Sequence, residues 1–233
     1  MGLGKERKSM KVVYRMCDIT SSNAPPVYWE NKYRLNEICL RSFVESFKDI
    51  KPHVFMICDR CPEFYETFVR SIVPFEMDIE FTQSGIKENA VHQYDYVTDD
   101  DIYYMCECDY LHTPDAGQKM LDAVTHFDWI TSYDHPDKYK EGLIPKQNTR
   151  QYINGQQWRT TDSTTSTFMA RGSKIREQME LFRSYGWDDH KRWLDLNERG
   201  YVLGSPVPSL STHMAEEYLA QNVDWKSLWE KYV

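Results

Sequence analysis

The sequence predicts an α/β protein built on a mainly parallel central sheet with helices on both of its faces. Short apolar runs typical of buried strands alternate with segments of helical periodicity between residues 11 and 133. The 233 residues are enough for one sizeable domain. No internal repeat, low-complexity run or linker divides the chain, so we expect a single domain at 11–233 behind a short basic leader at 1–10.

Each apolar run in the first half of the chain is followed by a helical segment. KVVYRMC at 11–17 is the first expected strand, and residues 33–48 carry apolar side chains at helical spacing. Thr113 is the expected N-cap of a helix that has Pro114 at its first position. The further strands and helices of this half are expected, in alternation, at 54–58, 63–73, 78–82, 85–97, 102–106, 113–126 and 129–133.

The second half of the chain has a different pattern. Residues 134–165 are polar and rich in turn-forming residues, and a short strand is expected at 165–170. Helices are expected at 173–184 and 188–199, the latter closed by Gly200, and Asp224 should cap a terminal helix.

Composition excludes several classes of protein. The net charge of −8 argues against nucleic acid as the main partner, because phosphate binding needs a basic surface. No run approaches the roughly 18 apolar residues of a membrane span. The six cysteines lie in or beside apolar runs, which indicates reduced thiols in a cytosolic protein. The same features fit a protein that acts at a membrane surface or forms one domain of a longer chain.

Two acids stand where the strand at 102–106 ends. In a parallel sheet, ligands bind beyond the carboxyl ends of the strands. Side chains alternate along an extended segment, so Glu107 and Asp109 should point the same way. Two carboxylates on one side can hold Mg²⁺ or Mn²⁺ and leave positions open for substrate phosphates. The alternative is a pair of solvated acids at the mouth of a loop.

The segment around these acids, DDDIYYMCECDYLHTPDA at 99–116, resembles the metal-binding segment of GT-A nucleotide-sugar glycosyltransferases, most closely the inverting, family-2-like enzymes. There, an apolar strand ends in an acidic DxD-type motif. The other segments that look like parts of these enzymes are NKYRLNEICLRSF, ICDRCP, FDWITSYDHPDKY, STTSTFMARG and GWDD. Together they extend over nearly the whole chain. Glu107 departs from the motif, which usually has Asp, so metal contact could be through Asp109 alone or through water.

The resemblance implies a GT-A-like single domain with two functional halves and a divalent cofactor. Residues 11–133 would bind the nucleotide sugar and residues 134–233 the acceptor. Mn²⁺ or Mg²⁺ would be held by Asp109 and Glu107, with His213 closing the site from the C-terminal region. Such an ion stabilises the departing diphosphate as a Lewis acid. For His213 the alternative is a loop histidine without a ligand.

The resemblance also implies a general base at the start of a helix, downstream of the metal motif. Asp188 and Asp189 lie at such a position. We expect Asp189 to take the proton of the acceptor hydroxyl. Asp188 is the second candidate for the base, although it is equally well placed as the N-cap of the helix.

Further residues are assigned to the substrates from the same resemblance. The donor is expected to be a nucleotide sugar, with UDP as the preferred nucleotide, and the acceptor a glycan hydroxyl. The predicted nucleotide-binding residues are Arg15, Asp18, Asp59, Lys87, Asn89 and Cys108. The predicted contacts to the acceptor or donor sugar are Trp158, Arg159, Asp134 and His135. For Asp59 the alternative is an ion pair with Arg60 or Arg15.

Two other functions remain open at this point. Four cysteines in the pairs CxxC and CxC, Cys58 with Cys61 and Cys106 with Cys108, could hold a structural zinc ion in a non-enzymatic module. A nucleotidyltransferase also uses a sheet, acids and Mg²⁺. It usually has a Gly-rich basic loop near the first strand, where this chain has SSNAPP at 21–26.

Overall fold

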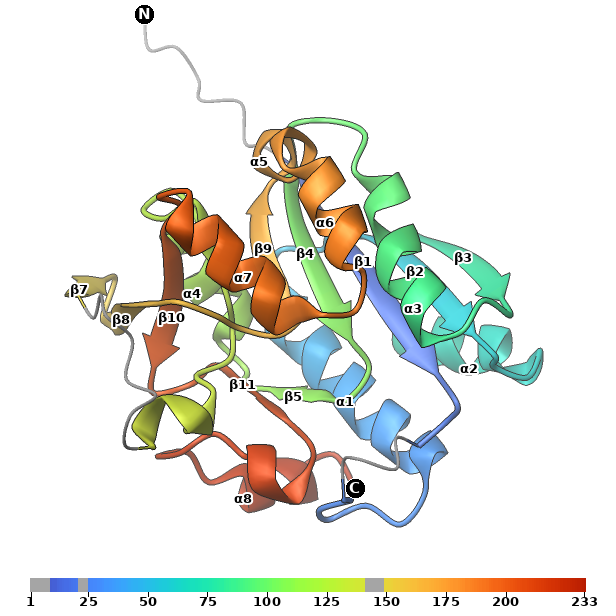
Figure 1. The fold of residues 1–233 in the computed structure, drawn as a ribbon. Coiled ribbons are helices and arrows are strands. Elements are labelled where there is room, and N and C mark those ends of the chain that lie inside the picture. The colour runs from blue at the N-terminus through green and yellow to red at the C-terminus, as the bar shows by residue number, and fades with distance from the viewer. Residues whose placement is uncertain (1–8, 21–24, 141–148) are drawn as a thin grey trace, which may run out of the picture.

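The computed structural model describes residues 9–20, 25–140 and 149–233. Its centre is a nine-stranded sheet in the order β3-β2-β1-β4-β9-β6-β10-β8-β7 (Figure 1). These strands are β1 (Met10–Cys17), β2 (His53–Asp59), β3 (Met77–Thr82), β4 (Ile102–Glu107), β6 (Trp129–Ile130), β7 (Arg150–Ile153), β8 (Gln156–Thr161), β9 (Phe168–Arg171) and β10 (Leu203–Val207). Only β8 and β9 run against the others, so the predicted mainly parallel sheet is confirmed.

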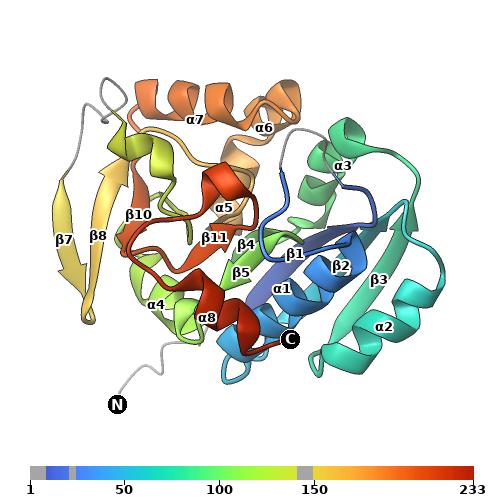
Figure 2. The same ribbon diagram turned by 90° about the horizontal axis from the view of Figure 1, so that it is seen from below.

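Helices cover both faces of this sheet, as predicted. Figure 2 shows α3 and α5–α7 on one side and α1, α2, α4 and α8 on the other. Their bounds are α1 (Lys32–Phe47), α2 (Phe64–Ile72), α3 (Ile86–His92), α4 (Ala116–Ala123), α5 (Gly172–Glu177), α6 (Met179–Tyr185), α7 (Asp189–Glu198) and α8 (Trp225–Glu230). Short 3₁₀ turns are η1 (Gln93–Tyr96), η2 (Pro136–Tyr139) and η3 (Glu216–Tyr218). In the described residues no helix is long and apolar enough to cross a bilayer.

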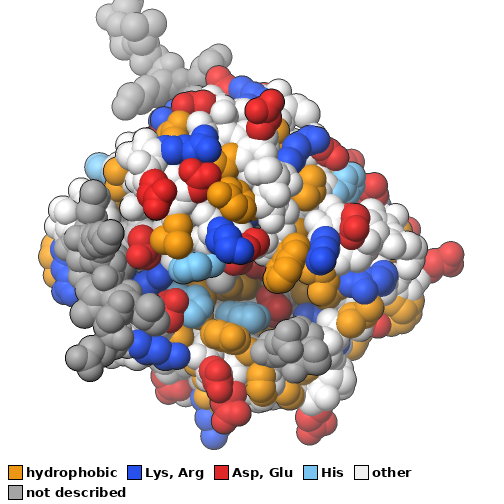
Figure 3. Space-filling model, in the orientation of Figure 1, with side chains coloured by type: hydrophobic (Ala, Val, Ile, Leu, Met, Phe, Trp, Pro, Cys, Tyr) orange, Lys and Arg blue, Asp and Glu red, His pale blue; other side chains and the backbone are white. Residues whose placement is uncertain are grey.

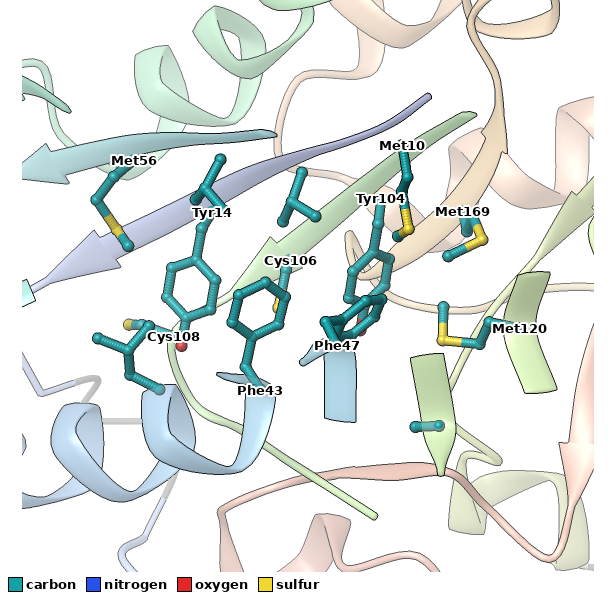
Figure 4. Close-up of a cluster of buried hydrophobic side chains, with 14 of the residues drawn as sticks. Met10, Tyr14, Phe43, Phe47, Met56, Tyr104, Cys106, Cys108, Met120 and Met169 are labelled. Atoms are coloured by element: carbon teal, nitrogen blue, oxygen red, sulfur yellow. The ribbon is translucent and has the colours of Figure 1, made fainter. Parts of the chain in front are cut away.

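Alternate side chains of the central strands enter two different cores. Tyr104 and Cys106 of β4 pack with Phe43 and Phe47 of α1 (Figure 4). Tyr103 and Met105, from the same strand, pack on the other face with residues of α5, α6 and α7. Strands buried on both faces read as continuous apolar runs, which explains why the sequence shows no polar alternation at 102–106.

Several elements differ from the expectations. Residues 134–165 contain the hairpin β7–β8, where only turns were expected. Its turn residues Asn154 and Gly155 both have positive φ (45° and 82°), the backbone that an Asn-Gly dipeptide favours in tight hairpins. The strand β10 was also missed, and β1 begins at Met10, within the expected leader.

The start of α4 was predicted two residues too early. Asp115, not Thr113, occupies the N-cap position. The hydroxyl of Thr113 donates to the Asp115 carboxylate at 2.9 Å, and the Thr113 amide donates to the Leu210 carbonyl. Thr113 therefore belongs to an extended connection that lies against the C-terminal region.

That connection belongs to a small second sheet that shapes the site. β5 (Tyr110–His112) pairs antiparallel with β11 (Ser211–His213), with Tyr110 opposite His213. Neither strand was expected from the sequence, because three-residue strands carry no periodic signal. This pairing brings the C-terminal region beside the end of β4.

Candidate functional site

A cavity of about 400 Å³ opens at the carboxyl ends of β1, β2 and β4. Ligands bind at this edge in open α/β sheets. Figure 3 shows this face of the molecule, where histidine side chains gather beside a hollow. The residues that line the cavity are Arg15, Met16, Cys17, Ile19, Thr20, Lys32, Asp59, Arg60, Ile86, Asn89, Glu107, Cys108 and Asp109.

Arg15 and Glu107 form an ion pair across the two neighbouring strands. Nη2 of Arg15 donates to Oε1 of Glu107 at 2.7 Å, and the hydroxyl of Thr167 donates to Oε2 at 3.3 Å. Partial burial raises the pKa of Glu107, and the charges of Asp109 and Asp189 raise it further, while Arg15 opposes the rise. In this arrangement both carboxylate oxygens of Glu107 already have protein partners.

Asp109 pairs with His213 instead. Oδ2 of Asp109 lies 3.3 Å from Nε2 of His213, and the Asp109 carbonyl accepts from the Met214 amide at 2.8 Å. The imidazole stacks between the rings of Tyr110 and Tyr218, each 5.4 Å away between centroids. The two rings fix the plane of the imidazole and direct Nε2 towards the carboxylate.

The charged groups around Asp109 and His213 shift one another's pKa. Burial alone would raise the pKa of Asp109, but the positive charges of His213 and Lys32 lower it below its ordinary value. Burial alone would lower the pKa of His213, but Asp109 and Glu107 raise it. Asp109 is therefore held as a carboxylate, the form that binds a hard cation.

The residues present fit a divalent ion only in part. An oxygen of Asp109 and a nitrogen of His213 lie 3.3 Å from each other, a spacing that suits two neighbouring ligands of one ion. Glu107 is turned towards Arg15 and Thr167. Across 9–20, 25–140 and 149–233 no group of three or more His, Cys, Asp or Glu side chains could hold a metal. An ion here would need most of its ligands from substrate and water, as Mg²⁺ commonly does.

Asp59 lies at the end of β2 and is almost fully buried. Its oxygens accept from the Gly85 amide at 3.1 Å, the Thr82 hydroxyl at 2.9 Å and Nε of Arg60 at 2.9 Å. Burial would raise its pKa, but these hydrogen bonds lower it. Gly85 has φ +87°, which favours glycine at this turn. The ion pair with Arg60, the alternative considered for Asp59, is present, and it leaves Asp59 as a buried support of the cavity wall.

Three buried polar atoms on residues that line the cavity have no protein partner: Nε of Arg15, Nη2 of Arg60 and Oδ1 of Asn89. Buried polar groups are rarely left unpaired without a ligand or water to satisfy them. Arg60 holds a left-handed backbone with φ 53°, and such strained positions cluster at functional sites. Two donors and one acceptor on residues of the cavity wall thus have no protein partner.

Sequence reasoning missed Arg60 as a cavity residue and Lys32 altogether. Lys32 is the first residue of α1, is buried, and lies in the cavity wall near Cys108 and Asp109. Burial works against its charge, but these neighbouring groups raise its pKa. No sequence signal marks Lys32, because a lysine in the first helical turn is ordinarily solvated.

The two acids before α7 have different environments. Asp188 caps α7: its carboxylate accepts from the Lys191 amide at 3.3 Å and from Nζ of Lys191 at 2.7 Å. Asp189 is half-buried, and burial raises its pKa while Arg192 and Arg15 oppose the rise. It lines a second cavity of about 220 Å³ together with His135, Asp137, Lys138, Ser163, Thr164, Thr165 and His190.

Several predicted site residues lie away from these cavities. Trp158 is fully buried against Phe127, so it cannot contact a sugar in this structure. Asp134 and Arg159 form a buried ion pair in which Nε of Arg159 donates to Oδ1 at 3.1 Å, and neither lines a described cavity. These side chains join β8 to the segment after β6, which is a structural role.

Of the remaining predicted residues, three line one of the two cavities and two lie outside both. Asn89 and Cys108 line the first cavity and His135 the second. Lys87 lies outside both, with Nζ 5.6 Å from the Trp187 ring centroid in a separate surface depression. Asp18 accepts a hydrogen bond from the Tyr65 hydroxyl and does not line the cavity.

The zinc alternative does not fit the structure. All six cysteines are free thiols. Cys106 is fully buried in the α1-side core, and the sulfur of Cys108 contacts that of Cys17 at 4.0 Å. Since the described residues contain no cluster that could hold a metal, Cys58, Cys61, Cys106 and Cys108 do not form a zinc site.

Comparison with known proteins supports the fold. No family model and no curated protein sequence matches the chain. Among solved structures it is similar to 4-diphosphocytidyl-2C-methyl-D-erythritol synthase from Anaerococcus prevotii, with TM-score 0.53 and 8% identity over 84% of this chain and 87% of that one. The inositol-1-phosphate CTP transferase from T. maritima matches with TM-score 0.52 and 10% identity over 97% and 96%. The galactosyltransferase LgtC, solved with donor and acceptor sugar analogues, matches with TM-score 0.44 and 11% identity over 80% and 69%.

These similarities concern the fold. The first two structures share with this chain a mixed α/β architecture, and the LgtC score is too low to support an argument. The expected α/β fold, with a mainly parallel sheet and helices on both faces, is confirmed. The GT-A family and the inverting mechanism stay predictions.

Proposed function

We propose that the protein is a glycosyltransferase that moves a sugar from a nucleotide diphosphate sugar to an acceptor hydroxyl. The observation that carries the proposal is Asp189, a half-buried carboxyl with a raised pKa beside a second, hydroxyl-lined cavity. A carboxylate whose pKa lies nearer to neutrality is a better proton acceptor. Nucleotidyl transfer to a phosphate needs no such base, because the attacking phosphate oxygen carries no proton to remove.

The first cavity suits the nucleotide diphosphate. Arg15, Lys32 and Arg60 line it and supply positive charge for a diphosphate. Asn89 and Arg60 line the same cavity, and a small side-chain rotation would turn the unpartnered Oδ1 of Asn89 and Nη2 of Arg60 towards a base or ribose. Uracil presents both an imide N–H and carbonyl oxygens, which is compatible with UDP as donor. The choice of UDP itself derives from the family resemblance.

A divalent ion, Mn²⁺ or Mg²⁺, would be held by Asp109 and His213 and would supply Lewis-acid stabilisation of the leaving diphosphate. Glu107 would contribute through the charge it places beside Asp109, or directly if it leaves Arg15. Arg15 and Lys32 add fixed positive charge near the same groups. Such preorganised charge favours the state in which the diphosphate bears its full negative charge.

The second cavity suits the acceptor. Its wall of hydroxyl side chains from Ser163, Thr164 and Thr165 can exchange hydrogen bonds with sugar hydroxyls. Asp189 would take the acceptor proton as the acceptor oxygen bonds to the anomeric carbon and the bond from that carbon to the diphosphate breaks. Attack from the face opposite the diphosphate would invert the anomeric centre.

A nucleotidyltransferase is the second candidate, and it is favoured by the two solved structures with the higher scores, one of which is a CTP transferase. The cations of the first cavity, Arg15, Lys32 and Arg60, would also suit a nucleoside triphosphate. The loop that would distinguish the two enzymes by sequence, near residues 21–24, lies outside the described residues.

A product assay separates the two candidates. The protein with Mn²⁺ or Mg²⁺ is incubated with a panel of nucleotide sugars, with and without a mixture of simple glycosides, and nucleoside diphosphate release is measured. In parallel it is incubated with nucleoside triphosphates and sugar 1-phosphates, and pyrophosphate is measured. We expect nucleoside diphosphate from one donor and no pyrophosphate. Pyrophosphate release that needs a sugar phosphate would replace the first candidate by the second.

A further inference from the structure

Two cysteines face each other in the wall of the first cavity. Sγ of Cys17 lies 4.0 Å from Sγ of Cys108, and both residues line the cavity. Cys17 is partly exposed and Cys108 is buried. The other four cysteines, Cys39, Cys58, Cys61 and Cys106, are buried as well and line none of the described cavities. Cys17 and Cys108 are thus the two cysteines in the wall of a described cavity, where the partly exposed Cys17 is open to a small reagent.

The backbone geometry permits a covalent bond between these two residues. Cys17 is the last residue of β1, and Cys108 follows the last residue of β4. The two strands pair in parallel with Arg15 opposite Glu107, so Cys17 lies one position beyond the residue in line with Cys108. Neighbouring strands lie about 4.7–4.9 Å apart, and disulfides join Cα atoms separated by about 4.4–6.8 Å. The sulfurs must approach to about 2.05 Å, which side-chain rotation and a small shift of the strand ends can supply.

We propose that Cys17 and Cys108 are a thiol modification site that forms an intramolecular disulfide with a low-molecular-weight disulfide as oxidant. The Cys17 sulfur attacks the reagent, forms a mixed disulfide and releases one thiol. The Cys108 sulfur then attacks Sγ of Cys17, forms the internal bond and releases the second thiol. The two cysteines lose two electrons and two protons, and both appear on the two thiols released from the reagent.

This bond alters the nucleotide site, a consequence that rests on the proposed function. It joins the end of β1 to the residue directly before Asp109 and draws together two strands that form the cavity wall. The cavity then loses the shape that the reduced strand ends give it. Oxidation weakens nucleoside diphosphate binding by at least about 10-fold, and reduction restores it. A bound nucleotide in turn slows oxidation, because it occupies the space beside both sulfurs.

The test treats the whole protein with oxidised glutathione, digests it with trypsin and identifies cross-linked peptides by mass spectrometry. The expected product joins peptide 16–32, which contains Cys17, to peptide 88–119, with fragmentation assigning the bond to Cys108. Cys17→Ser and Cys108→Ser each abolish this product, whereas the matched control Cys58→Ser keeps it. Circular dichroism of each variant confirms that it is folded before the result is scored.

The outcomes separate the two proposals. Glutathione bound to Cys17 without a cross-link, or a cross-link between other cysteines, overturns the modification site. The expected cross-link with equal nucleotide affinity before and after reduction overturns its effect on the cavity. If the reduced protein binds no nucleotide, the proposed function fails, while the mass measurement still decides whether the cysteines pair.

Discussion

The carboxylate of Asp109 lies 3.3 Å from Nε2 of His213, although 104 positions separate the two residues in the chain. The contact depends on pairing of β5 with β11, which sets Tyr110 opposite His213. It joins Asp109, which lines the first cavity, to the C-terminal region. The proposed metal site depends on the Asp109–His213 pair more than on the neighbouring Glu107, which forms an ion pair with Arg15.

Replacing His213 by Phe should weaken metal-dependent binding of a nucleoside diphosphate. Phenylalanine keeps the ring stacked between Tyr110 and Tyr218 but removes the nitrogen that faces Asp109. Loss of a group that binds the metal or orients its ligand typically costs about 10–100-fold in metal affinity. Titration calorimetry with Mn²⁺ should show this loss, and binding without metal should change little.

His53→Phe is the matched control, because His53 pairs with Asp78 near the start of β2, outside the cavity. It should bind like the unmodified protein. Equal metal-dependent affinity in His213→Phe and the unmodified protein would remove His213 from the metal site.

Removing Arg15 should destabilise the fold. Arg15→Met leaves Glu107 without its ion-pair partner in a partly buried position, where the Glu107 side chain is 30% exposed. Removing one partner of a fully buried pair costs about 3–5 kcal/mol, and the exposure of Glu107 reduces our expectation to about 1–3 kcal/mol. Urea unfolding measures this loss.

Two further variants define the cause. Arg15→Met with Glu107→Gln should recover part of the loss, because no unpaired carboxylate remains. Arg41→Met removes an exposed pair with Glu37 on α1 and should cost less than about 1 kcal/mol. A double variant as unstable as Arg15→Met would show that the arginine contributes through packing instead.

The two acids before α7 should behave differently. Asp189→Asn should lower the transfer rate by about 10²–10⁴-fold, because the amide cannot accept the acceptor proton. Donor binding should persist. Asp188→Ala should leave the rate within a few-fold but cost about 0.5–2 kcal/mol of stability through loss of the N-cap. A reversed pattern would make Asp188 the base.

The rate should also depend on pH through Asp189. Because burial raises the pKa of this carboxyl, the base form is lost at a higher pH than for an ordinary aspartate. The transfer rate should therefore fall on acidification before an ordinary aspartate would protonate, and the residual rate of Asp189→Asn should lack this step. A step of equal size in both proteins would assign it to another group.

His112 should make stability depend on pH. It is fully buried, with Nε2 2.7 Å from the Tyr104 hydroxyl, and burial lowers its pKa to about 3. The unfolded chain, with a histidine pKa near the usual value of about 6.5, binds the proton more readily. The stabilisation is fully present above about pH 6.5 and is lost as the pH falls towards 3.

Comparing the unmodified protein with His112→Gln isolates this contribution. The difference in unfolding free energy between the two should fall by up to about 2 kcal/mol from pH 7 to pH 5, at about 1.4 kcal/mol per pH unit. A constant difference would mean that His112 is protonated in the folded protein as readily as in the unfolded chain.

The first half of the fold could be predicted because each element carries its own periodic signal. Strands such as β4 are buried on both faces and read as apolar runs, and α1 shows helical spacing over its full length. The carboxyl-end rule then placed Glu107 and Asp109 in one cavity with Arg15. These three positions follow from local sequence and sheet topology together.

The remaining parts of the site and of the second half of the fold depend on contacts that local sequence does not encode. The pairing of β5 with β11 is three residues long, and Lys32 enters the cavity only because of where α1 begins. Trp158 and Arg159 were assigned to sugar binding from a polar segment that instead forms the hairpin strand β8. The Asn154–Gly155 dipeptide was the available signal for that hairpin.

The most direct test of the central claim is titration calorimetry with UDP, GDP, TDP and CMP, each with and without Mn²⁺, on the unmodified protein and on Asp109→Ala. We expect one of these nucleotides to bind in a metal-dependent manner and Asp109→Ala to abolish the metal-dependent part. Absence of binding by every nucleotide in the presence of Mn²⁺, or equal binding by both proteins, would contradict it.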